Sequence, residues 1–257
     1  MRRVVAFVAW IGVIGEFVTP AAAEDFRIET RVFVGRSKTA ASENLTLFQS
    51  GYVYDYLSGP DRVAVFDKPH GRFILLDPAR ELKAEVKTDD VMVFAKKLRD
   101  LAAKNSSAFM KFAAEPDFET KFAQDGALTL SSRYLTYRLK TEPAPTPEAA
   151  DQYHDFSNWY ARFNAMTNPG STPPFPRLVV NAELASRGLV PTEVHLTISN
   201  QSGLGNRGAT MRTEHHVSWR LLESDVAKIA ETANQLAAFK AAELAELQPK
   251  TSASIKR

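Results

Sequence analysis

Residues 45–87 read LTLFQSGYVYDYLSGPDRVAVFDKPHGRFILLDPARELKAEVK, and this stretch decides the fold. Within it, apolar and polar residues alternate along short runs, as they do in β-strands that bury one face. Clusters of Gly, Pro and Asp interrupt the alternation, because these residues favour tight turns. The stretch therefore predicts an antiparallel meander with strands at 45–56, 62–67, 72–77 and 82–87.

The strand predicted at 45–56 is apolar on both faces. Taken as one continuous strand, it places Phe48, Tyr52 and Tyr54 on one side and Leu47 and Val53 on the other. A strand of this kind is either covered on two sides or lines a groove.

Similar patterns extend outward in both directions. Helices are predicted to begin at Thr88, Thr146 and Ser224, where side-chain oxygens can cap the first turn. Further strands are predicted at 26–34, 118–123, 128–139, 177–184, 192–198 and 210–221. The expected fold class is α+β and mostly antiparallel, a curved open sheet or half-barrel of about ten strands with about three helices. We expect a single β-rich domain at 24–257, with a helical insertion at 146–176 and a C-terminal helix at 224–247.

The first residues have the pattern of an export signal. Arg2 and Arg3 precede an apolar run that reaches Val18, and Ala21 and Ala23 then form an A-x-A cleavage site. The run is shorter than the roughly 20 residues that a spanning helix needs, and no later run is long enough. We therefore expect a signal peptide at 1–23 and a soluble mature protein, periplasmic or secreted, with no membrane span after cleavage.

Composition excludes several classes of function. The chain has no cysteine, which rules out thiol nucleophiles, thiolate metal sites, disulfides and a lipid-anchored cysteine. Its net charge of +2 is too small to attract nucleic acid strongly. No serine lies in a nucleophile-elbow pattern. We expect no enzymatic activity, with an undetected hydrolase kept as an alternative.

Residues 203–208, GLGNRG, match the glycine pattern of dinucleotide-binding turns. That chemistry requires a helix to follow the glycines, whereas strand-like alternation resumes at once from Thr210. We interpret the segment as a hairpin loop and expect no cofactor.

Histidines offer the other candidate site. His215 and His216 are adjacent on a predicted strand and point to opposite faces, so they do not both bind one metal. A site that combines His195 with one of them and with Glu193 or Glu214 is the alternative. Sheet-surface histidines are the preferred interpretation, and we expect no metal.

Asp55, Asp67 and Asp77 recur at strand ends, and paired carboxylates are what a glycosidase needs. Asp67 and Asp77 lie beside turns, where Asp accepts local backbone hydrogen bonds. We interpret both as turn residues.

Aromatic residues are the most distinctive remaining feature. The chain has 16 Phe, 7 Tyr and 3 Trp, many of them on predicted strands. They form either a core under the helices or the lining of an apolar groove, gated by the helix from Thr146 and the proline-rich segment 172–176. In the second interpretation the ligand-binding residues are Phe48, Tyr52, Tyr54, Phe66, Phe73, Tyr137, Phe156 and Trp219.

The order of elements, and the segment from Gly51-x-Val53-Tyr54-Asp55 to Leu75-Leu76-Asp77, resemble the periplasmic lipoprotein carrier and receptor superfamily (LolA/LolB-like). The resemblance implies an unclosed barrel whose concave side is plugged by helices, with acyl chains held between them. The chain departs from the family in having no predicted helix before its first strand and no lipobox cysteine. The second departure argues against a membrane-anchored receptor.

Two hypotheses follow. The first is an exported protein that binds or carries an apolar ligand, a lipid or the acyl chains of a lipoprotein, in the concave face of a curved sheet. The alternative is a non-catalytic cell-envelope scaffold that binds a partner protein through a sheet edge or the C-terminal helix.

Overall fold

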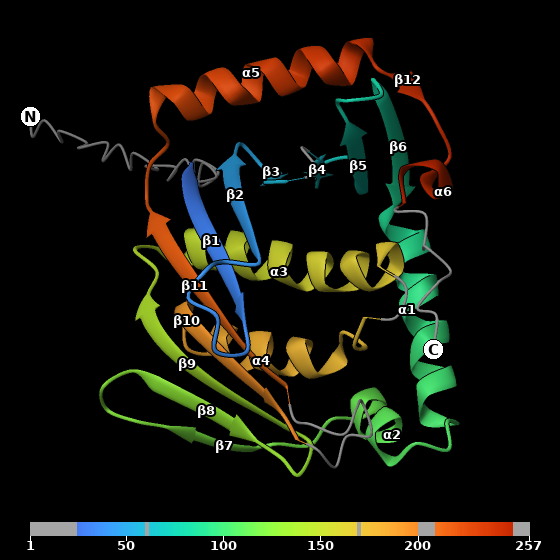
Figure 1. Ribbon diagram of the computed structural model, residues 1–257. Helices are drawn as coiled ribbons and strands as arrows, with labels where there is room; N and C mark the ends of the chain where they lie inside the picture. The colour runs from blue at the N-terminus through green and yellow to red at the C-terminus, as the bar shows by residue number, and fades with distance from the viewer. Residues whose placement is uncertain (1–24, 60–61, 169–170, 200–208, 249–257) are drawn as a thin grey trace, which may run out of the picture.

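The computed structural model describes residues 25–59, 62–168, 171–199 and 209–248 (Figure 1). Its strands are β1 (Phe26–Val34), β2 (Ser42–Gln49), β3 (Tyr52–Leu57), β4 (Arg62–Asp67), β5 (Arg72–Asp77), β6 (Leu82–Lys87), β7 (Glu119–Phe122), β8 (Ala127–Ser131), β9 (Leu135–Pro143), β10 (Leu189–Ile198), β11 (Ala209–Ser218) and β12 (Lys240–Ala241). Its helices are α1 (Thr88–Ala103), α2 (Ala108–Ala114), α3 (Pro147–Thr167), α4 (Phe175–Ala185), α5 (Glu223–Ala238) and α6 (Leu244–Leu247).

The strands lie in one open sheet in the order β12-β6-β5-β4-β3-β2-β1-β11-β10-β9-β8-β7. Neighbours are antiparallel, except that β12 runs parallel to β6. Strand β1 pairs with both β2 and β11, which joins the N-terminal meander to the C-terminal strands. The expected α+β class with an open, mostly antiparallel sheet is confirmed. The expected counts were too low, because the described residues form twelve strands and six helices.

The strand predicted at 45–56 is in fact two strands, β2 and β3. Ser50 and Gly51 have φ values of 51° and 83° and form a two-residue loop between the paired residues Gln49 and Tyr52. Positive φ at both loop positions suits the twist of a tight hairpin. Because the chain reverses here, each residue of β2 shares a side of the sheet with the residue paired to it on β3. The faces that were assigned by assuming one continuous strand are therefore wrong from this turn onward.

The strand predicted at 128–139 is likewise divided, into β8 and β9. The Ser132 hydroxyl accepts hydrogen bonds from the backbone N–H groups of Tyr134, at 3.2 Å, and Leu135, at 3.0 Å. A serine can hold such a turn with its hydroxyl alone, without the Gly or Pro that marks other turns in a sequence. The hairpin predicted at Asp125-Gly126 is present, with Gly126 at φ 81° between β7 and β8.

Residues 177–184, predicted as a strand, belong to helix α4. Pro176 lies in the first turn of the helix, where a missing N–H costs nothing. The buried residues Val180, Asn181 and Leu184 share one helical face. The pair Val179-Val180 favoured the strand prediction. The helical insertion therefore continues beyond the predicted 146–176, through both α3 and α4.

The predicted helix starts are better placed than the helix ends. At the start of α3, the Thr146 hydroxyl accepts a hydrogen bond from Ala149 N–H at 3.2 Å, and Pro147 follows the cap, as predicted. The C-terminal helix predicted at 224–247 ends at Ala238. The chain then adds β12 to the edge of β6, where Lys240 pairs with Leu82.

Helices cover the sheet unequally. Helices α3 and α4 lie inside the bend of the sheet, and α5 crosses the outer face of β2–β6 (Figure 1). One core cluster joins the sheet to α3, and another joins the outer face to α5 through Ile229. The middle of the sheet is thus covered on two sides, which explains why β2 and β3 are apolar on both faces.

Candidate functional site

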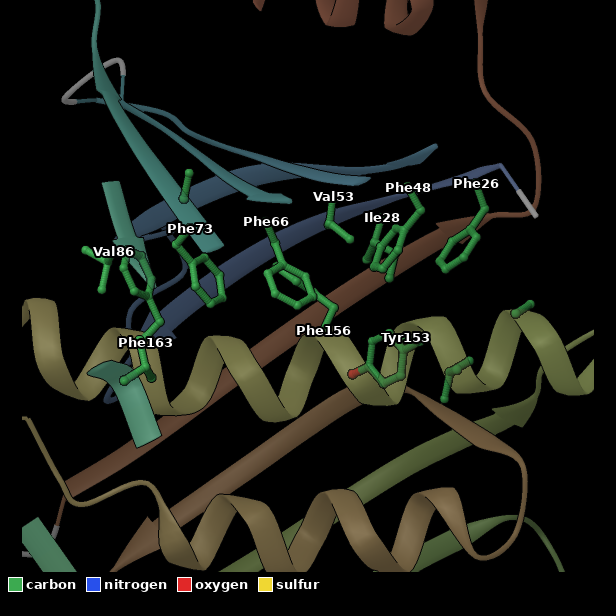
Figure 2. Close-up of a cluster of buried hydrophobic side chains, with 14 residues drawn as sticks. Phe26, Ile28, Phe48, Val53, Phe66, Phe73, Val86, Tyr153, Phe156 and Phe163 are labelled. Atoms are coloured by element: carbon green, nitrogen blue, oxygen red, sulfur yellow. The ribbon is translucent and has the colours of Figure 1, made fainter. Parts of the chain in front are cut away.

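One half of the concave side is packed solid. Rings from β1, β2, β4 and β5 meet rings from α3 (Figure 2). Phe73 stacks on Phe163 with ring centroids 4.2 Å apart and on Phe66 at 4.7 Å. Phe26 and Phe48 stack at 4.0 Å. This half is an aromatic core.

The other half contains a groove with two arms that meet at Ala161, Asn164 and Arg177. The first arm, of about 470 Å³, lies between α3 and strands β1–β3 and β11. The second arm, of about 300 Å³, lies between α3, the start of α4 and strands β9–β11. The apolar side chains of the first arm are Ile28, Val32, Phe48, Leu57, Tyr153, Phe156 and Ala161. Those of the second arm include Leu135, Tyr137, Val194, Leu196, Ile198 and Met211.

Side-chain size explains why the groove stays open. On α3, the face toward the groove carries Ser157, Ala161 and Asn164 at i, i+4 and i+7, next to the face that carries the large rings. On β1, the inward row changes from aromatic Phe26 to Thr30 along the strand. Short side chains on both layers leave a hollow, because α3 is held at the distance that the rings of the core require.

Asp55 is a buried carboxylate at the end of the first arm. Its Oδ1 accepts hydrogen bonds from Asn44 Nδ2, at 2.6 Å, and from Thr46 Oγ1, at 2.7 Å, and Tyr160 on α3 donates a third. Burial raises the pKa of Asp55 and outweighs these hydrogen bonds, which lower it. Burial also raises the pKa of Tyr160 well above its ordinary value, and the charge of Asp55 adds to the effect. The carboxylate is therefore satisfied by neutral donors and tied to α3.

Arg177 and His215 line the groove where the arms meet. His215 Nδ1 lies 3.0 Å from the Thr30 hydroxyl. Burial, together with the charge of Arg177, lowers the pKa of His215 to about 3, so the imidazole is neutral at physiological pH. The Arg177 charge also acts on Tyr137, whose pKa burial raises. The meeting point therefore holds one guanidinium among neutral groups.

The structure divides the eight predicted ligand residues into groups. Phe48, Phe156 and Tyr137 line the groove. Phe66 and Phe73 belong to the aromatic core. Trp219 packs at the far end of that core, with its ring 5.1 Å from Phe26.

The structure corrects the predicted positions of Tyr52 and Tyr54. Both lie on the outer face of the sheet, in the cluster under α5, because the turn at 50–51 reverses the pleat. They are on the opposite side of the sheet from the groove, and only neighbours such as Val53 face inward.

Sequence reasoning missed Tyr160 and Arg177 as groove residues. Tyr160 lies in the predicted helical pattern of α3, but its partner Asp55 is far away in sequence. Arg177 was expected on a strand, where it has no relation to the groove. The proline-rich segment 172–176 was expected to gate the groove; its Pro173 and Pro174 are buried and line the second arm, and its last two residues begin α4.

The candidate histidines divide between the two faces of the sheet, with His195 and His216 on one face and His215 on the other. His195 and His215 face opposite sides of the sheet, and His195 bonds to the neighbouring Glu193. Within the described ranges, no three acidic or histidine side chains are grouped as metal ligands. Residues 203–208, for which a hairpin loop was predicted, lie outside the described part of the chain.

Asp67 and Asp77 stabilise turns, as predicted. Asp67 Oδ1 lies 2.7 Å from His70 Nδ1, and its Oδ2 accepts a hydrogen bond from Arg72 Nε at 2.8 Å. Asp77 accepts a similar bond from Arg80 Nε at 2.8 Å. Burial alone would raise the pKa of each carboxyl, but these partners outweigh it and lower the pKa.

The predicted signal peptide, with Ala21 and Ala23, lies outside the described residues. In the part of the chain that is described, none of the helices has the length and apolar character that a membrane span requires.

The likenesses of this chain to solved structures are weak. No family model and no curated protein matches the chain. A solved LolA superfamily protein from Nitrosomonas europaea is 7% identical, with 79% of this chain and 90% of that chain covered and a TM-score of 0.30. A DnaN sliding clamp from Bartonella birtlesii is 10% identical, with 83% of this chain and 62% of that chain covered and a TM-score of 0.13. The first of these has the family name that residues 51–77 suggested.

Proposed function

We propose that this protein binds an apolar, lipid-like ligand in the groove between α3, α4 and strands β1 and β9–β11. The observation that carries the proposal is the contrast between the two halves of the concave side. Large rings fill one half, whereas the other keeps two joined hollows of about 470 and 300 Å³. Hollows of this size that combine apolar walls with polar groups are typical of small-molecule sites.

The groove is supported by a rigid frame. The aromatic core fixes one face of α3, and Asp55 ties Tyr160 of the same helix to β2 and β3. A site held by packed neighbours loses little entropy when its ligand binds. We place the protein outside the inner membrane, on the leader pattern at 1–23, and N-terminal sequencing of the exported protein tests this.

The competing scaffold hypothesis receives less support. The apolar stripe of α5 is already occupied, because Ile229 and Leu236 pack on the sheet. The chain after α5 also folds back, and Arg80 Nη1 donates a hydrogen bond to the Glu246 carbonyl at 2.8 Å. A partner would have to use the exposed edge strand β7 instead.

Uptake of Nile red, together with mass spectrometry of the purified protein for bound lipid, tests the proposal. We expect a fluorescence increase that is lost in Ala161→Phe, because the new ring fills the meeting point of both arms. The matched control is Ala230→Phe on an exposed position of α5, on the other side of the sheet, which should leave uptake intact. A wild-type protein that takes up no probe and carries no lipid would end the proposal.

A further inference from the structure

The groove contains one formal positive charge with no ionic partner. Of the lysines and arginines in the described ranges, Arg177 alone lines either arm, and it borders both. Among the residues that the structure describes, no carboxylate forms an ion pair with it. The first turn of α4, to which it belongs, also has no acidic residue. Two guanidinium groups on other strands of the sheet do have such a partner: Arg27 pairs with Asp225 and Arg72 with Asp67.

The other polar groups of the groove do not compensate this charge. Asp55 lines the first arm but already accepts hydrogen bonds from Asn44, Thr46 and Tyr160. His215, beside Arg177, is neutral and bonds to Thr30. A partly buried guanidinium without an anion is costly, and its fork of N–H donors matches a carboxylate or phosphate. The meeting point of the two arms therefore has both the charge and the donors for an anion.

We propose that the groove takes a single-chain amphiphile with an anionic head, a long-chain carboxylate, whose head pairs with Arg177 while its chain lies along one of the apolar arms. The inference rests on the proposed function, because it names the ligand class of the same groove. It adds a specificity: a neutral lipid with the same chain loses the ionic contact and binds more weakly.

The test compares laurate with dodecanol, which has the same chain and a neutral head, as competitors of Nile red at about pH 8, where the carboxylate is ionised. We expect laurate to displace the probe from wild-type protein at a concentration about tenfold lower than dodecanol, as a charge-assisted contact permits. Arg177→Met should abolish this preference and leave displacement by dodecanol unchanged. Arg177→Lys, which keeps a point charge, should retain part of it.

Arg138→Met is the matched control, because Arg138 is exposed on β9 and its neighbours Tyr137 and Leu139 face inward. It removes the same charge from the outer face and should keep the preference for laurate. Equal displacement by laurate and dodecanol in the wild type, or an unchanged preference in Arg177→Met, would overturn the inference and leave the proposed function standing. Failure of the wild type to take up Nile red at all would instead contradict the proposed function. If Arg177→Met does not fold, the inference is tested by the preference of the wild type for laurate over dodecanol and by the partial preference expected of Arg177→Lys.

Discussion

The two halves of the concave side share one sheet and one helix, yet one is solid and the other hollow. Opposite β2–β5, the inner face of α3 meets phenylalanine rings, as between Phe73 and Phe163. Opposite β1 and β11, the same helix presents Ser157, Ala161 and Asn164. The packed rings set the distance between helix and sheet, and where the side chains are small this distance leaves a groove between them.

The outer faces of the two halves differ in the same way. Behind the aromatic core, the sheet is covered by α5 and its apolar contacts. Behind the groove, the outer face carries charged pairs such as Arg31 with Glu214 and Lys140 with Glu193. The solid half is therefore the double-covered frame, and the hollow half is a single layer under helices α3 and α4.

The largest expected effect tests the frame. Phe73 is fully buried between Phe66 and Phe163, so Phe73→Ala removes a ring from the centre of the core. We expect a loss of about 3–5 kcal/mol in the free energy of unfolding, measured by urea denaturation. Because α3 would lose its spacer, Nile red uptake should fall as well.

Phe122→Ala is the control for that experiment, because this phenylalanine is 45% exposed on the edge strand β7. It should cost about 1 kcal/mol or less. Equal losses for the two variants would mean that the aromatic core does not dominate the stability of the protein.

A second, smaller effect separates the buried acids of the two regions by pH. The folded state lowers the pKa of Asp67 in its turn, so the carboxylate contributes stability that is present above its unfolded pKa of about 3.9 and lost as the pH falls through the folded value. Asp55 has a raised pKa, so stability instead falls as the pH rises above about 3.9. As the pH rises, the stabilities of Asp67→Asn and Asp55→Asn relative to wild type should therefore change in opposite directions.

Urea unfolding of Asp67→Asn and Asp55→Asn between acidic and neutral pH measures this. Relative to wild type, Asp67→Asn should lose about 1–2 kcal/mol at neutral pH and little in acid. Asp55→Asn should become relatively more stable as the pH rises, since asparagine keeps one acceptor oxygen and carries no charge to bury. If both variants lost stability relative to wild type as the pH rose, the environment of Asp55 would not disfavour its charged form.

Sequence patterns predicted the frame better than the groove. Alternation located the strands of the meander, and the cap at Thr146 located the start of α3, because both signals are local. The face of each residue depended on where the turns fell. Ser50-Gly51 lies inside an apolar run, and reading through it placed Tyr52 and Tyr54 on the wrong side of the sheet.

The groove was less predictable because it depends on contacts between distant segments. Asp55 and Tyr160 meet only when α3 packs on β3. Arg177 faces the groove only because 177–184 is helical, whereas its valines suggested a strand. Whether a charge lies unpaired in an apolar hollow depends on the folded arrangement, and no residue spacing in the sequence predicts it.

The smallest expected effect is the sharpest test of the face assignment. Tyr54→Phe and Tyr137→Phe each remove one hydroxyl from a buried ring, the first under α5 and the second in the second arm of the groove. Each should change stability by about 1 kcal/mol or less. Tyr54→Phe should leave Nile red uptake unchanged, because the whole sheet separates it from the groove. Tyr137→Phe should tighten uptake slightly, because a groove wall becomes more apolar. An equal change in Nile red uptake in both variants would mean that the outer face of the sheet influences uptake as much as the groove wall does. The distinction between a solid frame and a hollow site would then not hold.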